Sequence, residues 1–284
     1  PRGMLGLDVT AETAAPTPHA RHASSPKVTV VVLAGGDATD VLAARVGAPA
    51  KALVPLKGRP LGAYVLDALV EADCVARVVW VGALDAAMRK QVDLAIPGGP
   101  RMVDSMALGA GAADAIRQPD EALLFVTADI PWLRGSSVDR FVRVASPLAP
   151  LVYPVVGRAA SEATFPGMQR TWIRLADGDV TGGNLLLVRP EALRRLLPWV
   201  DFATRDRKSP LWMAWQLGPG VLLRLVTGRA SLAFLERHLS RLIGTEVRAY
   251  LSDDPVLGTD VDRPEQLPAT LELADLRPKE PPTA

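Results

Sequence analysis

The sequence predicts an α/β protein of three layers, in which helices cover both faces of a mixed, mostly parallel sheet. The apolar, β-branched run Val28 to Leu33 has the pattern of a buried strand, and it breaks at Gly35 and Gly36. Leu61 to Ala72 then carries apolar residues at helical spacing, and Arg77 to Val81 is a second apolar run. Together these segments form a βαβ unit, which is expected to be right-handed.

The remaining pattern extends this unit. Further helices are expected over Leu84–Val92, Met102–Ile116, Pro190–Leu197, Leu211–Thr227 and Ser231–Leu242, and further strands over Ala122–Thr127, Leu151–Val156, Leu185–Val188 and Val247–Leu251. Residues 27–276 are predicted to be one domain, with a disordered leader over 1–26 and a disordered tail over 277–284. Residues 197–242 are expected to form a helical accessory segment, whose Leu, Trp and Met residues form core first and a lid or homodimer face second.

Composition narrows the class of protein. Nearly half of the 284 residues are hydrophobic (49%), so a substantial core is available. The formal charge is +1 and no long run of one sign occurs, so nucleic acid is not an expected partner. The single cysteine, Cys74, excludes an intramolecular disulfide framework. No apolar run could span a bilayer and no signal-peptide core is present, so no membrane is expected and the expected location is cytoplasmic.

The segment after the first strand has the chemistry of a phosphate site. Gly35 and Gly36 let backbone N–H groups approach a ligand, and ligands gather at this end of the strands in open α/β sheets. Lys51 and Arg45 supply the positive charge that a polyphosphate requires.

An ordered series of motifs carries a family resemblance. Leu33-Ala34-Gly35-Gly36, Arg45-Val46-Gly47, Lys51-Ala52-Leu53 and Gly58-Arg59-Pro60 resemble the signature of the MobA-like nucleotidyltransferases, which implies a Rossmann-like, GT-A-like fold. The resemblance implies that Leu33, Ala34, Gly35, Gly36, Arg45, Lys51 and Ser105 bind the nucleotide. Asp37 to Ala44 is an apparent insertion of about one helical turn or more, so Lys51 is the firmer phosphate assignment than Arg45. Ser105 is equally well explained as a helix cap.

Carboxylates at two places match the family's metal ligands. Asp129 directly follows the strand Ala122–Thr127, where a rigid element holds it, and the Asp-x-Pro that it begins resembles the family's Mg²⁺ ligand. The alternative is an aspartate that starts a turn. In extended chain Asp260 and Asp262 share one side, which is compatible with metal binding, and they resemble the family's closing motif. Asp260 is expected to face the metal, and Asp262 is alternatively a helix cap.

The resemblance also implies an acceptor site. Gly183 and Asn184 precede the strand Leu185–Val188, where the family carries a Gly-Asn pair that serves the substrate. Tyr153 is a candidate to flank this site. Arg158, Arg170 and Arg174 are each more simply explained as surface residues, although together they could receive an anionic acceptor.

The resulting hypothesis is an Mg²⁺-dependent nucleotidyltransferase that moves a nucleotide monophosphate from an NTP to a small phosphorylated acceptor and releases pyrophosphate. Lys51 and Asp129 are its expected catalytic residues, with Asp260 as the second metal ligand. A dinucleotide-dependent oxidoreductase is disfavoured because the G-x-G-x-x-G fingerprint is absent. A non-catalytic nucleotide sensor or regulatory subunit is the more serious alternative, and the nucleotide base and the acceptor, molybdopterin-type or a sugar phosphate, stay open.

Overall fold

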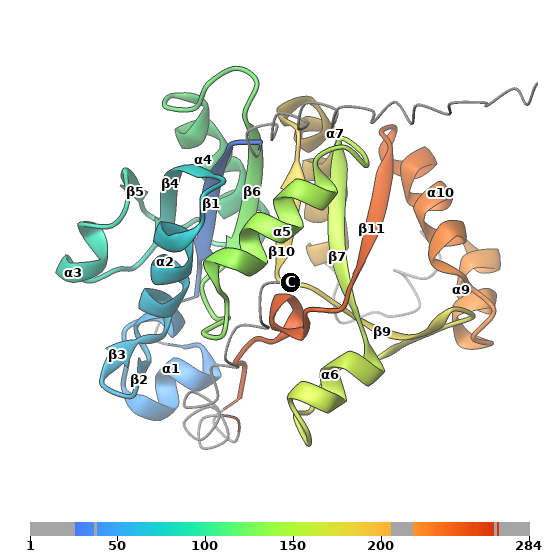
Figure 1. Ribbon diagram of the computed structural model, residues 1–284, viewed down its shortest axis with the longest axis horizontal. Coiled ribbons are helices and arrows are strands. Elements are labelled where there is room, and N and C mark those ends of the chain that lie inside the picture. The colour runs from blue at the N-terminus through green and yellow to red at the C-terminus, as the bar shows by residue number, and fades with distance from the viewer. Residues whose placement is uncertain (1–25, 37–38, 206–217, 264–265, 267–284) are drawn as a thin grey trace, which may run out of the picture.

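A mixed, nine-stranded sheet runs through the computed structural model (Figure 1), which describes residues 26–36, 39–205, 218–263 and 266. Its strand order is β5-β4-β1-β6-β10-β7-β9-β8, and β11 pairs with β7. The expected tail, the expected leader up to residue 25 and residues 211–217 of an expected helix lie outside the described residues. In the part of the chain that is described, no helix is long and apolar enough to cross a membrane.

The first half of the sheet is parallel. Val30 of β1 lies between Val78 of β4 and Leu124 of β6, and both pairings are parallel. β10 is antiparallel to both of its neighbours, and β11 is parallel to β7. The strands are β1 (Val28–Ala34), β4 (Val75–Gly82), β5 (Leu94–Ile96), β6 (Ala122–Thr127), β7 (Leu151–Gly157), β8 (Ile173–Leu175), β9 (Gly178–Gly182), β10 (Leu185–Val188) and β11 (Val247–Ser252).

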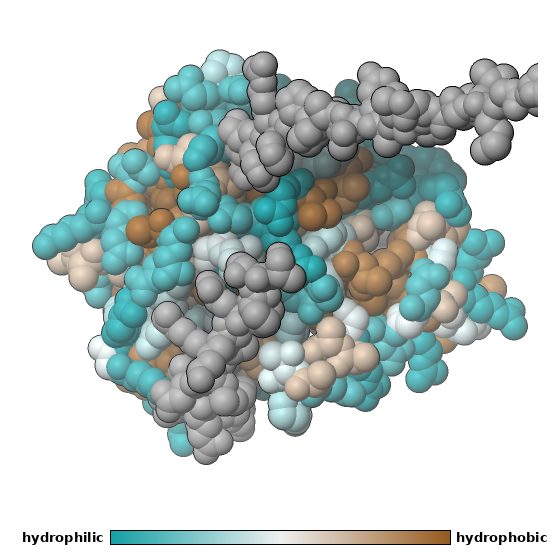
Figure 2. Space-filling view, viewed as in Figure 1, coloured by the Kyte–Doolittle hydropathy of each residue, from teal (hydrophilic) through white to brown (hydrophobic). Residues whose placement is uncertain are grey.

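Alternation along β1 divides the core between two faces of the sheet. Val30 and Val32 belong to a buried cluster with residues of α2 (Leu61–Glu71) and α5 (Gly135–Ala145), whereas Val31 belongs to a second cluster with residues of α4 (Met102–Asp114) and α7 (Pro190–Arg205). Because successive side chains of a strand point to opposite faces, one apolar run serves both layers. In Figure 1, α2 and α5 lie together in front of the sheet, and Figure 2 shows that their outer surface is mostly hydrophilic.

Short elements gather at the carboxyl ends of the central strands, at the bottom of Figure 1. They include α1 (Val41–Val46), the ribbon of β2 (Pro55–Leu56) and β3 (Arg59–Pro60), and α6 (Arg158–Thr164). At the far edge, α9 (Pro219–Val226) and α10 (Leu232–Ile243) contribute Leu225 and Leu235 to a small cluster around Val180 of β9. Of the expected accessory segment 197–242, these two helices therefore pack beside β8 and β9, whereas residues 197–205 continue α7 and contribute Leu197 and Val200 to the cluster with α4.

Several elements differ from the expected pattern. The helix expected over Leu84–Val92 is wrong in extent, because only α3 (Ala86–Arg89) forms before β5 begins. Asp93 ends it: its carboxylate accepts a hydrogen bond from Val78 N at 2.7 Å, and its N–H donates to Val78 O at 3.0 Å, which holds the chain beside β4. The sequence pattern also missed α5, α6 and the β8–β9 hairpin.

A buried carboxylate ties the amino ends of three strands together, at the opposite edge from the short elements. Glu121, only 7% exposed, accepts from Thr29 Oγ1 at 2.7 Å and from Arg77 Nη1 at 3.0 Å. Burial opposes its charge, but the hydrogen bonds from Thr29, the Gln118 backbone and Arg77 outweigh burial and lower the pKa of Glu121 below its ordinary value.

Candidate active site

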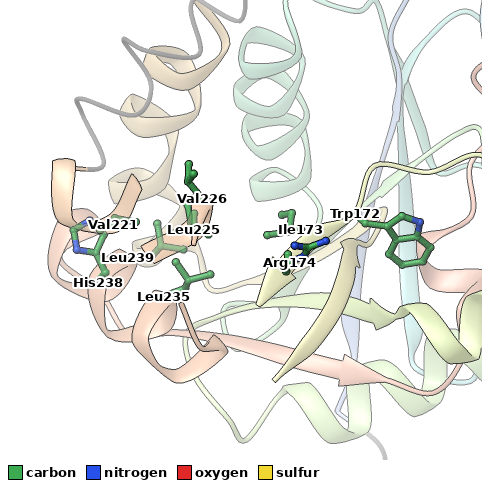
Figure 3. Close-up of a pocket in the computed structure, with 9 residues that line it drawn as sticks. All are labelled: Trp172, Ile173, Arg174, Val221, Leu225, Val226, Leu235, His238 and Leu239. Atoms are coloured by element: carbon green, nitrogen blue, oxygen red, sulfur yellow. The ribbon is translucent and has the colours of Figure 1, made fainter. Parts of the chain in front are cut away.

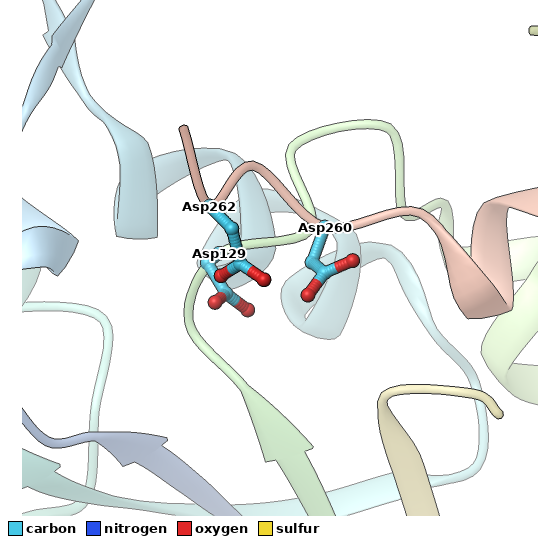
Figure 4. A group of neighbouring side chains, drawn as sticks. All are labelled: Asp129, Asp260 and Asp262. Atoms are coloured by element: carbon cyan, nitrogen blue, oxygen red, sulfur yellow. The ribbon is translucent and has the colours of Figure 1, made fainter. Parts of the chain in front are cut away.

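Three carboxylates meet at the carboxyl ends of β1 and β6. Asp129 follows β6, and Asp260 and Asp262 follow the 3₁₀ turn η2 (Pro255–Gly258). One oxygen from each of the three lies within 4.8 Å of the others, and in Figure 4 the side chains approach one another from two segments. Val261 N donates to Asp129 O at 3.0 Å, which fixes residues 260–262 against the loop that follows β6.

The side chains of residues 260–262 alternate in direction, which explains why both Asp260 and Asp262 reach the same place. Val261 is fully buried in a cluster with Leu42 and Ala43 of α1. With Val261 turned into that cluster, Asp260 and Asp262 fall on the other side of the extended chain. The apparent insertion, residues 37–44, thus contributes through α1 part of the apolar cluster that orients Asp260 and Asp262.

Lys51 lies among these carboxylates. Its Nζ is 2.5 Å from Asp129 Oδ2 and also donates to Asp262 Oδ1. Burial alone would lower the pKa of Lys51, but the charges and hydrogen bonds of the two aspartates outweigh it and raise that pKa above its ordinary value. The ammonium is therefore fully charged at neutral pH.

The single positive charge of Lys51 does not neutralise the three carboxylates. Burial, followed by the charges of Asp129 and Asp262, raises the pKa of Asp260 to about 6. Within the described residues, Asp129 Oδ1 is buried and has no hydrogen-bond partner. A buried carboxylate oxygen without a donor, beside two further carboxylates, fits a hard divalent cation with oxygen ligands.

A glycine-rich pocket of about 540 Å³ opens beside the end of β1. Three loops line it, through Ala34, Gly35, Gly36, Thr39, Asp40, Gly82, Ala83, Gly98, Gly99 and Pro100. Gly82 has φ +133° and lies so close to β1 that a Cβ would stand 2.2 Å from Ala34 O. Among the described residues the lining is mostly glycine and other small residues, so it presents mainly backbone to a ligand.

Ser105 holds one of the loops that line this pocket. It is buried, and its Oγ accepts a hydrogen bond from Gly99 N at 3.0 Å. The explanation of Ser105 as a helix cap is wrong, because α4 begins at Met102 and its cap position is Arg101.

A second pocket, of about 340 Å³, lies on the other side of the carboxylates. Asp260, Asp262, Gly183 and Asn184 line it together with Tyr153, Gln169, Arg170, Thr171, Thr181, Gly182, Gly258, Arg263 and Gln266. Backbone hydrogen bonds place Asn184 between β6 and η2, since its N–H donates to Leu257 O at 2.7 Å and its carbonyl accepts from Thr127 N at 3.1 Å. Its side-chain amide makes no hydrogen bond to the described residues, so it is available to a ligand in this pocket.

A third pocket, of about 580 Å³, is unlike the other two. It lies between β8 and the helices α9 and α10, and most of the side chains in Figure 3 are apolar. Arg174 lines this pocket, whereas Arg158 is paired with Glu162 and Asp179 on the surface. Of the three arginines considered for an anionic acceptor, only Arg170 reaches the pocket beside the carboxylates.

Comparison with known proteins agrees with this geometry. A family model described as the MobA-like NTP transferase domain matches residues 30–239. The chain belongs to this family. This MobA-like protein is accordingly a nucleotidyltransferase, which favours the enzyme over the sensor.

Solved structures give the same fold. A structure described as a hypothetical transferase from Thermus thermophilus is 38% identical, with a TM-score of 0.75 over 85% of this chain and 99% of that chain. CMP:2-keto-3-deoxy-manno-octonic acid synthetase complexed with CTP is 14% identical with a TM-score of 0.54, covers 89% of this chain and 99% of its own, and shares the fold. Among curated proteins no match is found.

The structure brings most of the expected site residues of this MobA-like protein together. Lys51, Asp129 and Asp260 meet, with the two pockets on either side. Neither Leu33 nor Arg45 lines the glycine-rich pocket, and Arg45 is exposed in the last turn of α1, so the nucleotide contacts expected of them stay a prediction. The N-cap alternative for Asp262 involves residues 264–265, which lie outside the described residues.

Two residues of the site differ from what the sequence led us to expect. Asp262, for which the Asp-x-Asp motif left metal binding and helix capping open, joins the other carboxylates as a third oxygen donor. Arg263 lines the second pocket, and nothing local distinguishes it from a surface arginine.

Proposed function

We propose that the protein transfers a nucleotide monophosphate from an NTP to a small phosphorylated acceptor, with Mg²⁺ held by Asp129, Asp260 and Asp262. The convergence of these carboxylates with Lys51, between the glycine-rich pocket and the polar second pocket, carries the proposal. The first pocket would take the nucleoside and the second the acceptor, with Gly183 and Asn184 beside it.

The reaction joins the two substrates at the α-phosphorus of the NTP. A bond forms from an acceptor oxygen to that phosphorus, and the bond to the β-phosphate oxygen breaks, so pyrophosphate leaves with the electron pair. An acceptor phosphate is already ionised at neutral pH, so no general base is needed. The metal would supply charge neutralisation for the phosphates.

The chain's own groups provide positioning and charge. Lys51, fixed on the turn η1 (Lys51–Leu53), lies close enough to the acidic cluster to bind phosphate oxygens. Backbone N–H groups around Gly35 and Gly36 approach the ligand without a Cβ in the way. Preorganised groups of this kind lower the barrier by holding reactants in line and by offsetting charge.

The test is a thermal-shift panel of ATP, GTP, CTP and UTP, each with Mg²⁺ and with EDTA, on the wild type, Asp129→Asn and Asp67→Asn. Asp67 is the control, because its carboxylate is in an ion pair with Arg59 away from the cluster. A ligand at about 100 times its Kd stabilises by roughly 2.7 kcal/mol. We expect one nucleotide to stabilise the wild type and Asp67→Asn only with Mg²⁺, and Asp129→Asn to lose the effect. Equal stabilisation in EDTA would refute the metal assignment.

A further inference from the structure

Arg170 is a fixed guanidinium in the second pocket. It lies between α6 and β8, and it donates through Nη1 to Gly258 O and through Nη2 to Thr259 Oγ1. Its guanidinium also stands over the ring of Phe165, at 5.6 Å from the centroid. These contacts set the orientation of the group before any ligand arrives.

The charge of Arg170 has no carboxylate partner within ion-pair distance in the described part of the chain, and its buried Nε has no hydrogen-bond acceptor there. Burial lowers the pKa of Arg170, partly offset by the charge of Asp260. By contrast, the surface arginines Arg101 and Arg158 each pair with two carboxylates. A half-buried guanidinium without a counter-ion is costly unless a ligand supplies the anion.

A second arginine comes to the same pocket from a distant segment. Arg263 lines it directly after Asp262, and its Nη1 donates to Gln169 Oε1 at 3.2 Å. Gln169 precedes Arg170, so this contact joins the two arginine-bearing segments across the pocket. The pocket consequently holds the carboxylates of Asp260 and Asp262 and, close to them, the guanidinium groups of Arg170 and Arg263.

We infer that Arg170 and Arg263 bind a second anionic group of the acceptor, a phosphate or a carboxylate, other than the group whose oxygen attacks. This inference rests on the proposed function and narrows its substrate to a small acceptor with two anionic groups. One anionic group would lie with the metal at the aspartates, and the other would be held by the arginines. The volume of about 340 Å³ is near the lower end for small-molecule sites, which favours a compact metabolite.

The assignment is tested with two variants, Arg170→Met and Arg263→Met, and one control, Arg174→Met. Arg174 is the matched control, because it lines the apolar third pocket. Each protein is first loaded with Mg²⁺ and a non-hydrolysable analogue of the stabilising NTP, and then titrated calorimetrically with inorganic phosphate and with malonate. We expect at least one anion to bind the wild type and Arg174→Met, with affinity at least tenfold lower in Arg170→Met and Arg263→Met. The anion that binds distinguishes a phosphate from a carboxylate group.

Equal anion affinity in all four proteins, or no binding of either anion to the wild type, would overturn the inference. Nucleotide loading is measured in the same samples, so failure of the proposed function shows as loss of loading in the wild type and is separate from loss of anion binding. Arg170→Met also removes the contacts to Gly258 and Thr259 and is checked by its melting temperature. Arg263→Met removes a surface contact to Gln169 and a positive charge beside Asp262, so Mg²⁺ binding is measured for this variant as well, and the inference stays testable if the first variant does not fold.

Discussion

Lys51→Met isolates what the lysine does for the acidic cluster before a metal binds. The Lys51 and Asp129 side chains are only 12% and 16% exposed, whereas Asp262 is 60% exposed. Removing one partner of a largely buried ion pair costs about 3 kcal/mol, and the more exposed contact adds at most about 1 kcal/mol. Two carboxylates at 4.8 Å repel by roughly 3.5 kcal/mol at an effective dielectric constant of 20, so the uncompensated cluster is strained.

We therefore expect Lys51→Met to lower the free energy of unfolding by about 3 kcal/mol in EDTA, and the melting temperature by roughly 6–12 °C. Excess Mg²⁺ should restore more stability to the variant than it adds to the wild type, because the ion takes the place of the missing charge. Urea unfolding with EDTA and with Mg²⁺ measures both quantities. Lys90→Met, at the exposed end of α3, is the control. An equal loss of stability in EDTA and in Mg²⁺ would show that Lys51 and the ion do not share a site.

Three further substitutions test the parts around the site. Glu121 has a lowered pKa, so it stabilises the fold above its unfolded pKa of about 4.3, and this stabilisation is lost as pH falls through the folded value. Glu121→Gln should cost about 2 kcal/mol at pH 7, and the cost measured by urea unfolding should shrink as pH falls below about 4.3. Gly82→Ala places a Cβ 2.2 Å from Ala34 O, and should cost at least about 2 kcal/mol and weaken NTP binding in calorimetry. Ser105→Ala removes a hydrogen bond worth about 1 kcal/mol from Gly99, so the KM for NTP should rise roughly fivefold while the KM for the acceptor is unchanged.

Elements with a strong local pattern were predictable from the sequence. The strands expected over Ala122–Thr127 and Leu185–Val188 are confirmed at the same bounds, because a buried strand is a continuous apolar run. The apolar residues of α5 recur at helical spacing, so that helix carried a usable signal. β8 and β9 are short and partly exposed, and their pairing depends on β7.

The position of a site residue was predictable from the sequence only where that residue directly follows a rigid element. Asp129 could be placed because it directly follows a buried strand. The convergence of Asp262 depends on Val261 being buried in a cluster that includes α1, which is far away in the sequence. The lack of an ion pair at Arg170 within the described residues is likewise a property of the folded pocket, since its sequence neighbours resemble those of any surface loop.

The cluster around Val261 makes the orientation of Asp260 and Asp262 depend on packing against α1. Leu42 of α1 is fully buried there, so Leu42→Ala should leave a cavity, cost about 3 kcal/mol and loosen Asp260 and Asp262. Leu69→Ala is the matched control, because Leu69 is equally buried in the main core, away from the carboxylates. If α1 orients the segment, Leu42→Ala lowers Mg²⁺ affinity severalfold in calorimetry while Leu69→Ala does not, although both lose similar stability. Equal Mg²⁺ affinity in the two variants would mean that the hydrogen bond between Val261 and Asp129 alone suffices to hold the carboxylates together.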